Sequence, residues 1–386
     1  VLCCKKSLGD FLMSIKKAFR IKSEIINFDD VTSLLTYLDL NKNDLLLTES
    51  RIFDKYLENK VKDARVIIRD NYISHGPNSE NLIEKITAES GAQCSRVIGI
   101  GGGAVLDLAK LLALETAVPV KNLFAQNITL HKARELILIP TTPGTGSEVT
   151  QYCAVYVPDL GAQFILDDEA LCADQAILCP EFLSGIPLKV LAASSFDAFV
   201  HAFESYLSPL ATPFSQALAK DAMQKILEVW KDVTSLGAAD LEKSYKQLQT
   251  AGTLSGLSYA NAGCAAVHAL SYPLSIRLKI PHGEANYLVF NEVLKIYAAK
   301  NPTGALDDIE EIIASTLNCT KENALIKSDN LCGTLMQRKP LSSYGMKENQ
   351  ILEFTDMVLT RQHMLIANGY VQLTVGEIAQ IYKDLL

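Results

Sequence analysis

The hydrophobic positions in the first half of the chain form short continuous runs, separated by stretches with helical periodicity. Continuous apolar runs of this length are typical of strands that are covered on both faces. We therefore expect strands at Asp44–Leu47, Arg65–Arg69, Arg96–Ile100, Glu135–Ile139 and Ala176–Leu178. Apolar residues three and four apart predict helices between them, including Asn81–Glu89 and Val105–Glu115. Strands that alternate with helices favour a parallel α/β sheet.

From about Leu183 the pattern changes to consecutive segments with a period of 3.6 residues, and strand signals nearly vanish. The predicted helices are Ser195–Tyr206, Pro213–Trp230, Leu241–Leu257, Asn286–Ala299, Leu306–Leu317, Lys347–Ala367 and Thr374–Leu385. We expect two domains, an α/β domain at residues 13–182 and an all-helical domain at 183–386, with a ligand-binding cleft between them. Residues 1–12, before Met13, are expected to be an extension with no role in the fold.

The composition narrows the class of partner. The formal net charge of −8 argues against nucleic acid, because phosphate binding needs a surplus of Lys and Arg. The most apolar stretch, residues 97–118, contains Asp107, Lys110 and Glu115, so no membrane helix is expected. Nine cysteines, an odd number without a C-x-x-C pair, favour neither a disulfide framework nor a structural zinc site. Several lie in apolar runs, where small buried residues are expected. A reducing cytoplasm is the compartment that this predicts.

A glycine-rich turn joins a predicted strand to a predicted helix at Gly101–Lys110 (GGGAVLDLAK). Glycine lets the backbone approach a ligand closely, and the free N–H groups of a helix start favour a pyrophosphate. Gly102, Gly103 and Ala104 are the candidates for this contact. The spacing is neither G-x-G-x-x-G nor a Walker loop, and the same glycines would also suit a purely structural turn. Asp107 and Lys110 could equally be a solvated pair on the helix surface.

A second polar cluster follows the strand Glu135–Ile139, at residues 140–150 (PTTPGTGSEVT). Ligands bind at the carboxyl ends of parallel strands, although a polar loop of turn residues is the simpler reading. Two such loops in one sheet make a shared ligand more plausible than either alone. Glu49 ends another predicted strand, where an acid often binds a ribose hydroxyl and repels a 2′-phosphate, which favours NAD over NADP.

A possible metal site involves three of the six histidines. Asp197 and His201 are four residues apart, so they lie one turn apart on one helical face and could chelate one cation. An exposed polar stripe would give the same pattern. His268 lies in an apolar segment and could be a satisfied core residue, and His282, between Pro and Gly, could cap a helix. Together, three His and one Asp would suit a divalent cation with an open position for substrate.

In this order, the motifs resemble those of the iron-containing alcohol dehydrogenases. The resemblance rests on Gly101–Lys110, residues 140–150, Asp197–His201 (DAFVH), His268 and residues 281–283 (PHG), and it extends from about Ile21 to the C-terminus. It implies a Rossmann-like parallel-sheet domain followed by an all-α metal-binding domain, a dehydroquinate synthase-like arrangement. It also implies Fe²⁺, or Zn²⁺ or another divalent transition metal, on Asp197, His201, His268 and His282. The implied NAD contacts are Glu49, Gly102, Gly103, Ala104, Asp107, Thr141, Thr142, Ser147 and Val149.

Within this family, residues 268–273, 281–287 and 338–346 are most similar to the 4-hydroxybutyrate dehydrogenases. These interconvert 4-hydroxybutyrate and succinate semialdehyde with NAD. The resemblance implies that Tyr272, where many members carry a His, could relay the proton, and that the chain forms a homodimer or larger homo-oligomer. Ala104 replaces a Ser of the family pattern, and the segment 159–165 lacks a cofactor-contacting Lys. Cationic candidates for a substrate carboxylate are Arg277, Lys279, Arg338 and Lys339.

Three other functions remain open. The first is the same chemistry on another short-chain alcohol or diol, such as butanol or 1,3-propanediol. The second is a different reaction on a similar fold, as in dehydroquinate synthase or glycerol-1-phosphate dehydrogenase, whose metal-ligand patterns fit these motifs poorly. The third is a decayed member that acts as a binding protein, which the missing Lys favours and the intact ligand set opposes.

Overall fold

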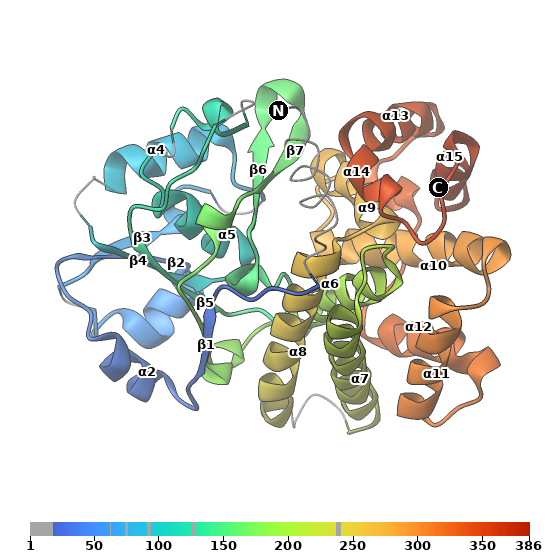
Figure 1. Ribbon diagram of the computed structural model, residues 1–386, viewed down its shortest axis with the longest axis horizontal. Helices are drawn as coiled ribbons and strands as arrows, with labels where there is room; N and C mark the ends of the chain where they lie inside the picture. The colour runs from blue at the N-terminus through green and yellow to red at the C-terminus, as the bar shows by residue number, and fades with distance from the viewer. Residues whose placement is uncertain are drawn as a thin grey trace, which may run out of the picture.

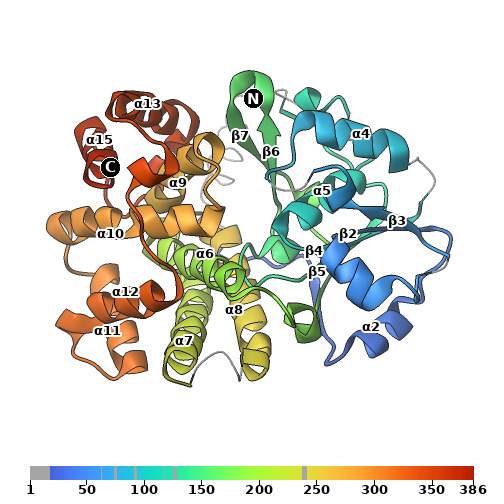
Figure 2. The same ribbon diagram turned by 180° about the vertical axis from the view of Figure 1, so that it is seen from behind.

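The computed structural model describes residues 18–61, 63–73, 76–90, 94–116, 118–124, 128–236 and 241–386. The predicted N-terminal extension, residues 1–12, lies outside the described residues. Within them, the molecule has a sheet-containing part and a helical part side by side (Figures 1 and 2). The predicted boundary between residues 182 and 183 stays a prediction.

A six-stranded sheet with only parallel pairings forms the centre of the N-terminal part, in the order β1-β8-β5-β4-β2-β3. Its strands are β1 (Glu24–Asn27), β2 (Asp44–Thr48), β3 (Arg65–Ile68), β4 (Arg96–Gly101), β5 (Glu135–Pro140) and β8 (Gln175–Leu178). The five predicted strands are confirmed. The sequence analysis missed β1, an edge strand whose four residues are all at least partly exposed, so that it lacks a continuous apolar run.

Helices cover both faces of this sheet, as parallel strands require. They include α2 (Val31–Leu38), α4 (Glu80–Ser90) and α5 (Gly103–Leu112), with a short helical segment at α3 (Ser50–Ile52) that continues into a π-helical turn. Successive side chains of one strand point to opposite faces of the sheet, so they belong to two different hydrophobic cores. Leu45 and Leu47 of β2 pack with α4 and α5, whereas Leu46 packs with α2.

An antiparallel hairpin, β6 (Tyr152–Val157) and β7 (Ala162–Asp167), stands apart from the sheet. The sequence analysis did not predict it, because only alternate residues of β6 are buried and the pattern has a period of two rather than a continuous run. In both views the hairpin lies between the two parts of the molecule (Figures 1 and 2). Contacts between β7 and α9 connect it to the helical part.

The C-terminal part is all-helical over its described residues, as predicted. Its helices are α6 (Leu188–Leu207), α7 (Pro213–Leu236), α8 (Leu241–Ala262), α9 (Ala266–Arg277), α10 (His282–Lys300), α11 (Ala305–Leu317), α12 (Ala324–Leu335), α13 (Ile351–Arg361), α14 (His363–Ala367) and α15 (Val375–Asp384). The prediction of one helix at Lys347–Ala367 is wrong. A 3₁₀ turn precedes α13, and the backbone leaves helical geometry at Gln362 before α14.

Two helices in the described residues of the C-terminal part were not predicted, α9 and α12. Helix α9 was not predicted because it contains Pro273. Proline lacks a backbone N–H donor and usually ends a helix. Tertiary packing overrides this local preference, because most of α9 is buried. No helix among the described residues is long and apolar enough to cross a membrane.

The two parts meet where the loop after β5 packs against α8. A Cβ atom at Gly256 of α8 would lie only 2.8 Å from the Cα of Gly146, so the backbones are in direct contact. Hydrogen bonds reinforce this approach: Gln249 Nε2 donates to the carbonyl oxygen of Pro140 (2.8 Å), and Thr253 Oγ1 donates to Glu148 Oε1 (2.7 Å). The polar loop at residues 140–150 is therefore held by both parts of the molecule.

Candidate metal and cofactor site

Helix α6 carries three buried polar side chains on one face. Asp197, His201 and Glu204 are spaced by four and three residues, and their exposed fractions are 4%, 6% and 1%. The alternative of an exposed polar stripe is therefore excluded. Burying ionisable groups in the protein interior costs free energy unless each group has a hydrogen-bond or charge partner. Neighbouring elements must therefore supply partners to this face of α6.

The next two helices bring His268 and His282 to this face. His268 lies in the first turn of α9, and His282 is the first residue of α10. The start of α10 lies directly against α6, because a side chain at Gly283 would overlap the carbonyl oxygen of Ala193. Nε2 of His268 lies 3.5 Å and Nε2 of His282 lies 3.6 Å from the same Oδ1 atom of Asp197. Three elements thus converge on one carboxylate oxygen.

His201, the fourth predicted ligand, sits beside this trio rather than within it. The donor atoms of Asp197, His268 and His282 all lie within 4.8 Å of one another, whereas His201 joins His268 and Cys264 in a second such group. The ring of His201 stacks on that of His268, with centroids 4.5 Å apart. The structure therefore brings the four predicted residues together as two donor groups that share His268.

Glu204 sets the orientation of His268. Its Oε2 atom lies 2.6 Å from His268 Nδ1, and the two carboxylate oxygens also accept backbone N–H groups of Ala265 (2.8 Å) and Val267 (2.6 Å). A donor bond from Nδ1 to a carboxylate leaves the Nε2 lone pair for a metal, the usual outer-shell arrangement of metal-binding histidines. Glu204 was not among the residues predicted for this site, although its place three residues after His201 was a usable signal.

Asn286 is a further residue that the sequence analysis missed. It is fully buried, and its Nδ2 donates to Asp197 Oδ1 at 2.8 Å. Because Asn286 follows His282 by four residues on α10, the two side chains share a helix face. The i, i+4 spacing, also seen in Asp197 and His201, could have pointed to it. Asn286 holds the carboxylate that faces both imidazoles.

The pKa shifts in this cluster keep one carboxylate ionised and two imidazoles neutral. Burial alone would raise the pKa of Asp197, but His201, His282 and His268 hold that pKa well below its usual value, so the carboxylate stays ionised. Burial lowers the pKa of His201 to about 3 and also lowers that of His282, which keeps both rings neutral with lone pairs available. Burial opposes a charge on His268 too, but Cys264, Asp197 and Glu204 raise its pKa.

The donor set fits a divalent transition metal. Two buried carboxylates demand positive charge, which the proton on His268 supplies and which a divalent ion could replace. Nδ1 of His201 is buried without a hydrogen-bond partner among the described residues, as expected of a nitrogen that is reserved for a ligand. Imidazole nitrogens with one carboxylate accept Fe²⁺ and Zn²⁺ alike, so the residues favour the class of ion rather than one element.

One side of the donor cluster is open. The side chain of His282 is 32% exposed, whereas those of Asp197 and His268 are buried. Tyr272 of α9 stacks on the His282 ring, with centroids 5.2 Å apart and an interplanar angle of 16°. Burial is the main cause that raises the pKa of Tyr272, so its hydroxyl stays protonated at neutral pH. A proton donor therefore stands beside the accessible ligand.

The predicted cofactor residues lie at the carboxyl ends of three adjacent strands, β2, β4 and β5. Gly102 begins α5 as its N-cap, and no side chain caps the helix start. The free backbone N–H groups in the first turn of α5 can therefore bind an anion. Thr142 of the neighbouring loop flanks Gly102, and Thr141 Oγ1 donates to Glu49 Oε1 at 3.2 Å. These residues surround one edge of the sheet at its central strands.

Other predicted cofactor residues bind each other. Asp107 accepts hydrogen bonds from Ser147 Oγ (2.6 Å) and from the backbone N–H of Ala154 (2.9 Å), so it ties α5 to the second loop and to β6. Lys110 is fully buried and donates to the carbonyl oxygen of Tyr152, which excludes a solvated pair with Asp107. Val149 is buried against α8. Ala104 accepts a hydrogen bond from Asn78 through its carbonyl oxygen, and Gly103 packs against Thr145.

Tyr259 of α8 connects the loop after β5 to His201 of the donor cluster. Its hydroxyl donates to the carbonyl oxygen of Thr145 (2.7 Å), and its ring stacks on His201 with centroids 4.2 Å apart. The sheet edge and the donor cluster are therefore parts of one site between the two halves of the molecule. A site in such a position can hold two ligands next to each other, one at the sheet edge and one at the donor cluster.

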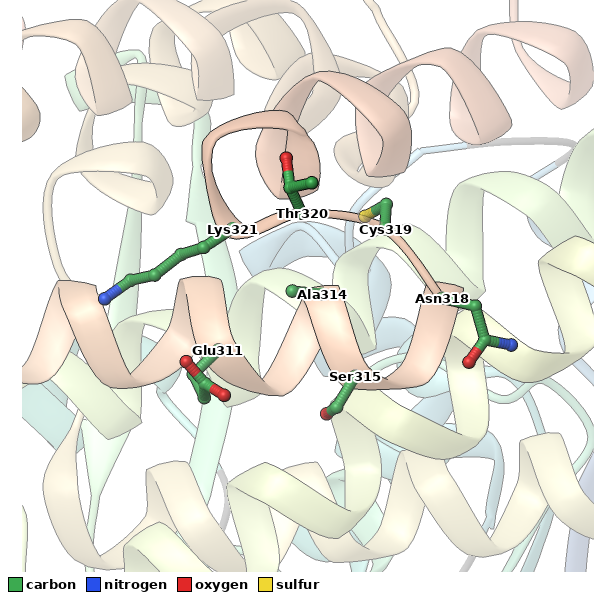
Figure 3. A pocket seen from close by; sticks show the side chains of 7 residues that line it. All are labelled: Glu311, Ala314, Ser315, Asn318, Cys319, Thr320 and Lys321. Carbon is green, nitrogen blue, oxygen red and sulfur yellow. The ribbon is translucent and has the colours of Figure 1, made fainter.

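A surface hollow of about 550 Å³ lies elsewhere, between α11 and the segment that follows it (Figure 3). It is lined by Glu311, Ala314, Ser315, Asn318, Cys319, Thr320 and Lys321. None of the predicted metal or cofactor residues contributes to it. The close-up shows the carboxylate of Glu311 and the amine of Lys321 on one side of the hollow and the amide of Asn318 on the other.

Relatives of this chain fall in one family. The sequence model described as "Iron-containing alcohol dehydrogenase" matches residues 25–180, and "Fe-containing alcohol dehydrogenase family, C-terminal" matches residues 191–386. The 4-hydroxybutyrate dehydrogenase of Clostridium kluyveri is 35% identical over 370 residues, which is 96% of this chain and 100% of that protein. A 1-propanol dehydrogenase of Salmonella typhimurium is 31% identical over 66% of this chain and 65% of its own length.

The fold agrees with these sequence matches. The crystal structure of a 1,3-propanediol oxidoreductase superposes with a TM-score of 0.82 at 21% identity, covering 96% of this chain and 100% of that one. Parallel sheet and helical part thus recur in the same arrangement. The chain belongs to the iron-containing alcohol dehydrogenase family and is an oxidoreductase.

Proposed function

We propose that this protein interconverts 4-hydroxybutyrate and succinate semialdehyde, with NAD as hydride carrier and a divalent metal, Fe²⁺ in the first place, at the donor cluster. The observation that carries this proposal is the 35% identity to the Clostridium kluyveri 4-hydroxybutyrate dehydrogenase, which spans 96% of this chain and the whole of that enzyme. Zn²⁺ or another divalent transition ion would suit the same ligands.

The sheet edge supports NAD as the cofactor. The uncapped start of α5 at Gly102 offers backbone donors to the pyrophosphate. Glu49, at the end of β2, presents a carboxylate to which Thr141 donates. A carboxylate there would accept a ribose hydroxyl and repel the extra phosphate of NADP. Gly103, Ala104, Asp107, Thr142, Ser147 and Val149 complete the proposed cofactor contacts.

In the proposed reaction the metal would polarise the substrate oxygen, and Tyr272 would supply its proton. A cation bound by Asp197, His201, His268 and His282 would supply Lewis-acid polarisation of that oxygen, and the nicotinamide would exchange hydride with its carbon. Tyr272 stays protonated and stacks beside the exposed His282. We assign it the proton that the oxygen gains when the aldehyde is reduced.

A substrate carboxylate needs a cation, and the structure separates the four candidates. Arg338 is engaged by Asp329 (2.8 Å) and lies over the ring of Tyr287. Arg277 pairs with Glu353 at 3.2 Å. Lys279, in the segment between Tyr272 and His282, has no carboxylate partner among the described residues.

The Nζ atom of Lys279 lies 5.8 Å from the ring centroid of Tyr156 on the β6–β7 hairpin, so Lys279 reaches across the junction of the two parts. A cation there, close in the chain to both His282 and Tyr272, suits the far end of a four-carbon substrate. We assign Lys279 this role. Lys339 is exposed and serves as its comparison.

Location and assembly complete the proposal. The seven cysteines of the described residues are free thiols, as a cytoplasmic setting would leave them. We also propose a homodimer or larger homo-oligomer, which sedimentation of the purified protein would test against a monomer mass of 42.2 kDa.

A second candidate function is oxidation of short-chain primary alcohols or diols that lack a carboxylate. The identity to the Salmonella typhimurium 1-propanol dehydrogenase favours it, although that match spans only 66% of this chain. The two candidates differ in the far end of the substrate, so substrate choice separates them.

The substrate assay follows NADH oxidation by succinate semialdehyde, butanal and 3-hydroxypropanal, with apoprotein and with added Fe²⁺ or Zn²⁺. We expect kcat/KM to be highest for succinate semialdehyde, to require metal and to fall when NADPH replaces NADH. Equal or higher kcat/KM for butanal would favour the second candidate. Absence of activity with every substrate in metal-loaded protein would support a binding role instead.

Replacing Glu204 with Gln should weaken metal binding. An amide places N–H groups against the backbone donors of Ala265 and Val267, so it no longer holds His268 in the required orientation. We expect the affinity for Zn²⁺ and Fe²⁺ to fall by about 10- to 100-fold, measured by competition with a chromophoric chelator. The exposed Glu311→Gln is the control, and unchanged affinity in Glu204→Gln would contradict the role assigned to Glu204.

Replacing Tyr272 with Phe should lower kcat for aldehyde reduction by about 100-fold, the usual size of a lost proton donor, while metal content stays the same. Tyr297→Phe is the matched control, because the hydroxyl of Tyr297 is buried without a hydrogen-bond partner among the described residues. A kcat in Tyr272→Phe close to that of the unmodified protein would show that the proton takes another route, such as water.

Replacing Lys279 with Met should raise KM for succinate semialdehyde by about tenfold, because a charge-assisted contact is lost. The kinetic constants for butanal, which has no carboxylate, should stay within about twofold on the same reasoning. Lys339→Met is the control for a general loss of positive charge. An equal rise in KM for both aldehydes in Lys279→Met would show a structural rather than a substrate-binding role.

A further inference from the structure

Cys264 lies against the metal-ligand cluster. The donor atoms of His201, Cys264 and His268 all lie within 4.8 Å of one another. In the sequence Cys264 lies in a run of small and apolar residues, and in the structure it is half-buried beside two imidazoles. Thiolate and imidazole are a preferred ligand pair for Zn²⁺ and related soft ions.

The backbone on both sides of Cys264 is held in place. Cys264 connects α8 to α9, and Asn368 Nδ2 donates to the carbonyl oxygens of Ala262 and Cys264, both at 2.9 Å. On the other side, the N–H of Ala265 donates to Glu204. The same Glu204 carboxylate orients His268. The backbone that carries the thiol is thereby held relative to His268 through Glu204, as pre-organised metal ligands require.

His201 supplies an independent indication of a ligand. Its ring is fixed between the rings of Tyr259 and His268, with centroids 4.2 and 4.5 Å away, so only atoms in its own plane can reach a partner. Its Nδ1 atom is buried without a hydrogen-bond partner among the described residues. A buried nitrogen in this condition is costly unless a ligand satisfies it.

We propose that Cys264 is an additional metal ligand, whose sulfur binds the ion on the side formed by His201 and His268. This inference rests on the proposed metal binding and adds a donor to the Asp197–His268–His282 trio. On binding, the S–H bond breaks, a sulfur–metal bond forms and the proton passes to solvent, with no change of oxidation state. Sulfur is a softer donor than nitrogen or oxygen, so Cys264 biases the site toward Zn²⁺ and Co²⁺ relative to Fe²⁺.

Cobalt gives a direct readout of this ligand. The full chain, stripped of metal and loaded with one equivalent of Co²⁺, should show visible d–d bands together with an intense near-ultraviolet thiolate-to-cobalt charge-transfer band. The variant Cys264→Ser should keep the d–d bands and lose the charge-transfer band. The control Cys332→Ser replaces a buried cysteine of α12 and should keep both.

The possible outcomes separate this inference from the metal proposal. A d–d spectrum without a charge-transfer band in the unmodified protein overturns the role of Cys264 and leaves the metal proposal standing. Failure of the unmodified protein to bind Co²⁺ overturns both. We also expect Cys264→Ser to weaken Zn²⁺ binding by about tenfold or more and to change Fe²⁺ binding less, whereas an equal loss for both ions contradicts the proposed bias.

A second measurement needs no variant and applies even if Cys264→Ser does not fold. X-ray absorption of the zinc-loaded unmodified chain should show one sulfur neighbour at about 2.3 Å from the metal. A shell of nitrogen and oxygen atoms alone would overturn the inference.

Discussion

Two carboxylates buried on a single helix, Asp197 and Glu204, impose a constraint on the rest of the structure. Their negative charges lie in a low-dielectric interior, so neighbouring elements must supply positive charge or donors. Glu204 is satisfied by two backbone N–H groups and His268, and Asp197 by Asn286 and the imidazoles that face it. Helices α9 and α10 supply most of these partners, since Ala265, Val267 and His268 lie at the start of α9 and Asn286 lies on α10.

The cofactor edge and the donor cluster depend on one another through α8. Gly256 allows the loop after β5 to contact the helix backbone, and Tyr259 on the same helix binds that loop and stacks on His201. A displacement of this loop would therefore reach His201, one of the proposed metal ligands. Hydride transfer needs the two reacting centres at a fixed separation, and contacts of this kind at the junction would help to keep that separation.

Most of the fold could be predicted from the sequence, and the errors in that prediction have physical causes. Five strands of the sheet had continuous apolar runs because helices cover both of their faces. The edge strand β1 and the hairpin β6–β7 lacked such runs, and α9 was hidden by Pro273, which packing tolerates. The site was accessible as a set of four candidate ligands. Glu204 and Asn286 were not predicted to act there. Each shares a helix face with a predicted ligand, but only the packing of α6 against α9 and α10 shows what their side chains contact.

By itself, the sequence determined the class of the parts: a parallel sheet with two polar loops at strand ends, a helical remainder, and a His and Asp set suited to a divalent ion. Local periodicity is sufficient for the sheet and the helical remainder, because it depends on neighbours along the chain. The His and Asp set followed from the resemblance to the family, since spacing alone left other readings open. Only the tertiary structure decided which donors meet, that His201 stands beside the trio with Cys264, and that Glu204 orients His268. Those relations join residues that are far apart in the sequence, such as Asp197 and His282, and the distances between them are set by how α6, α9 and α10 pack.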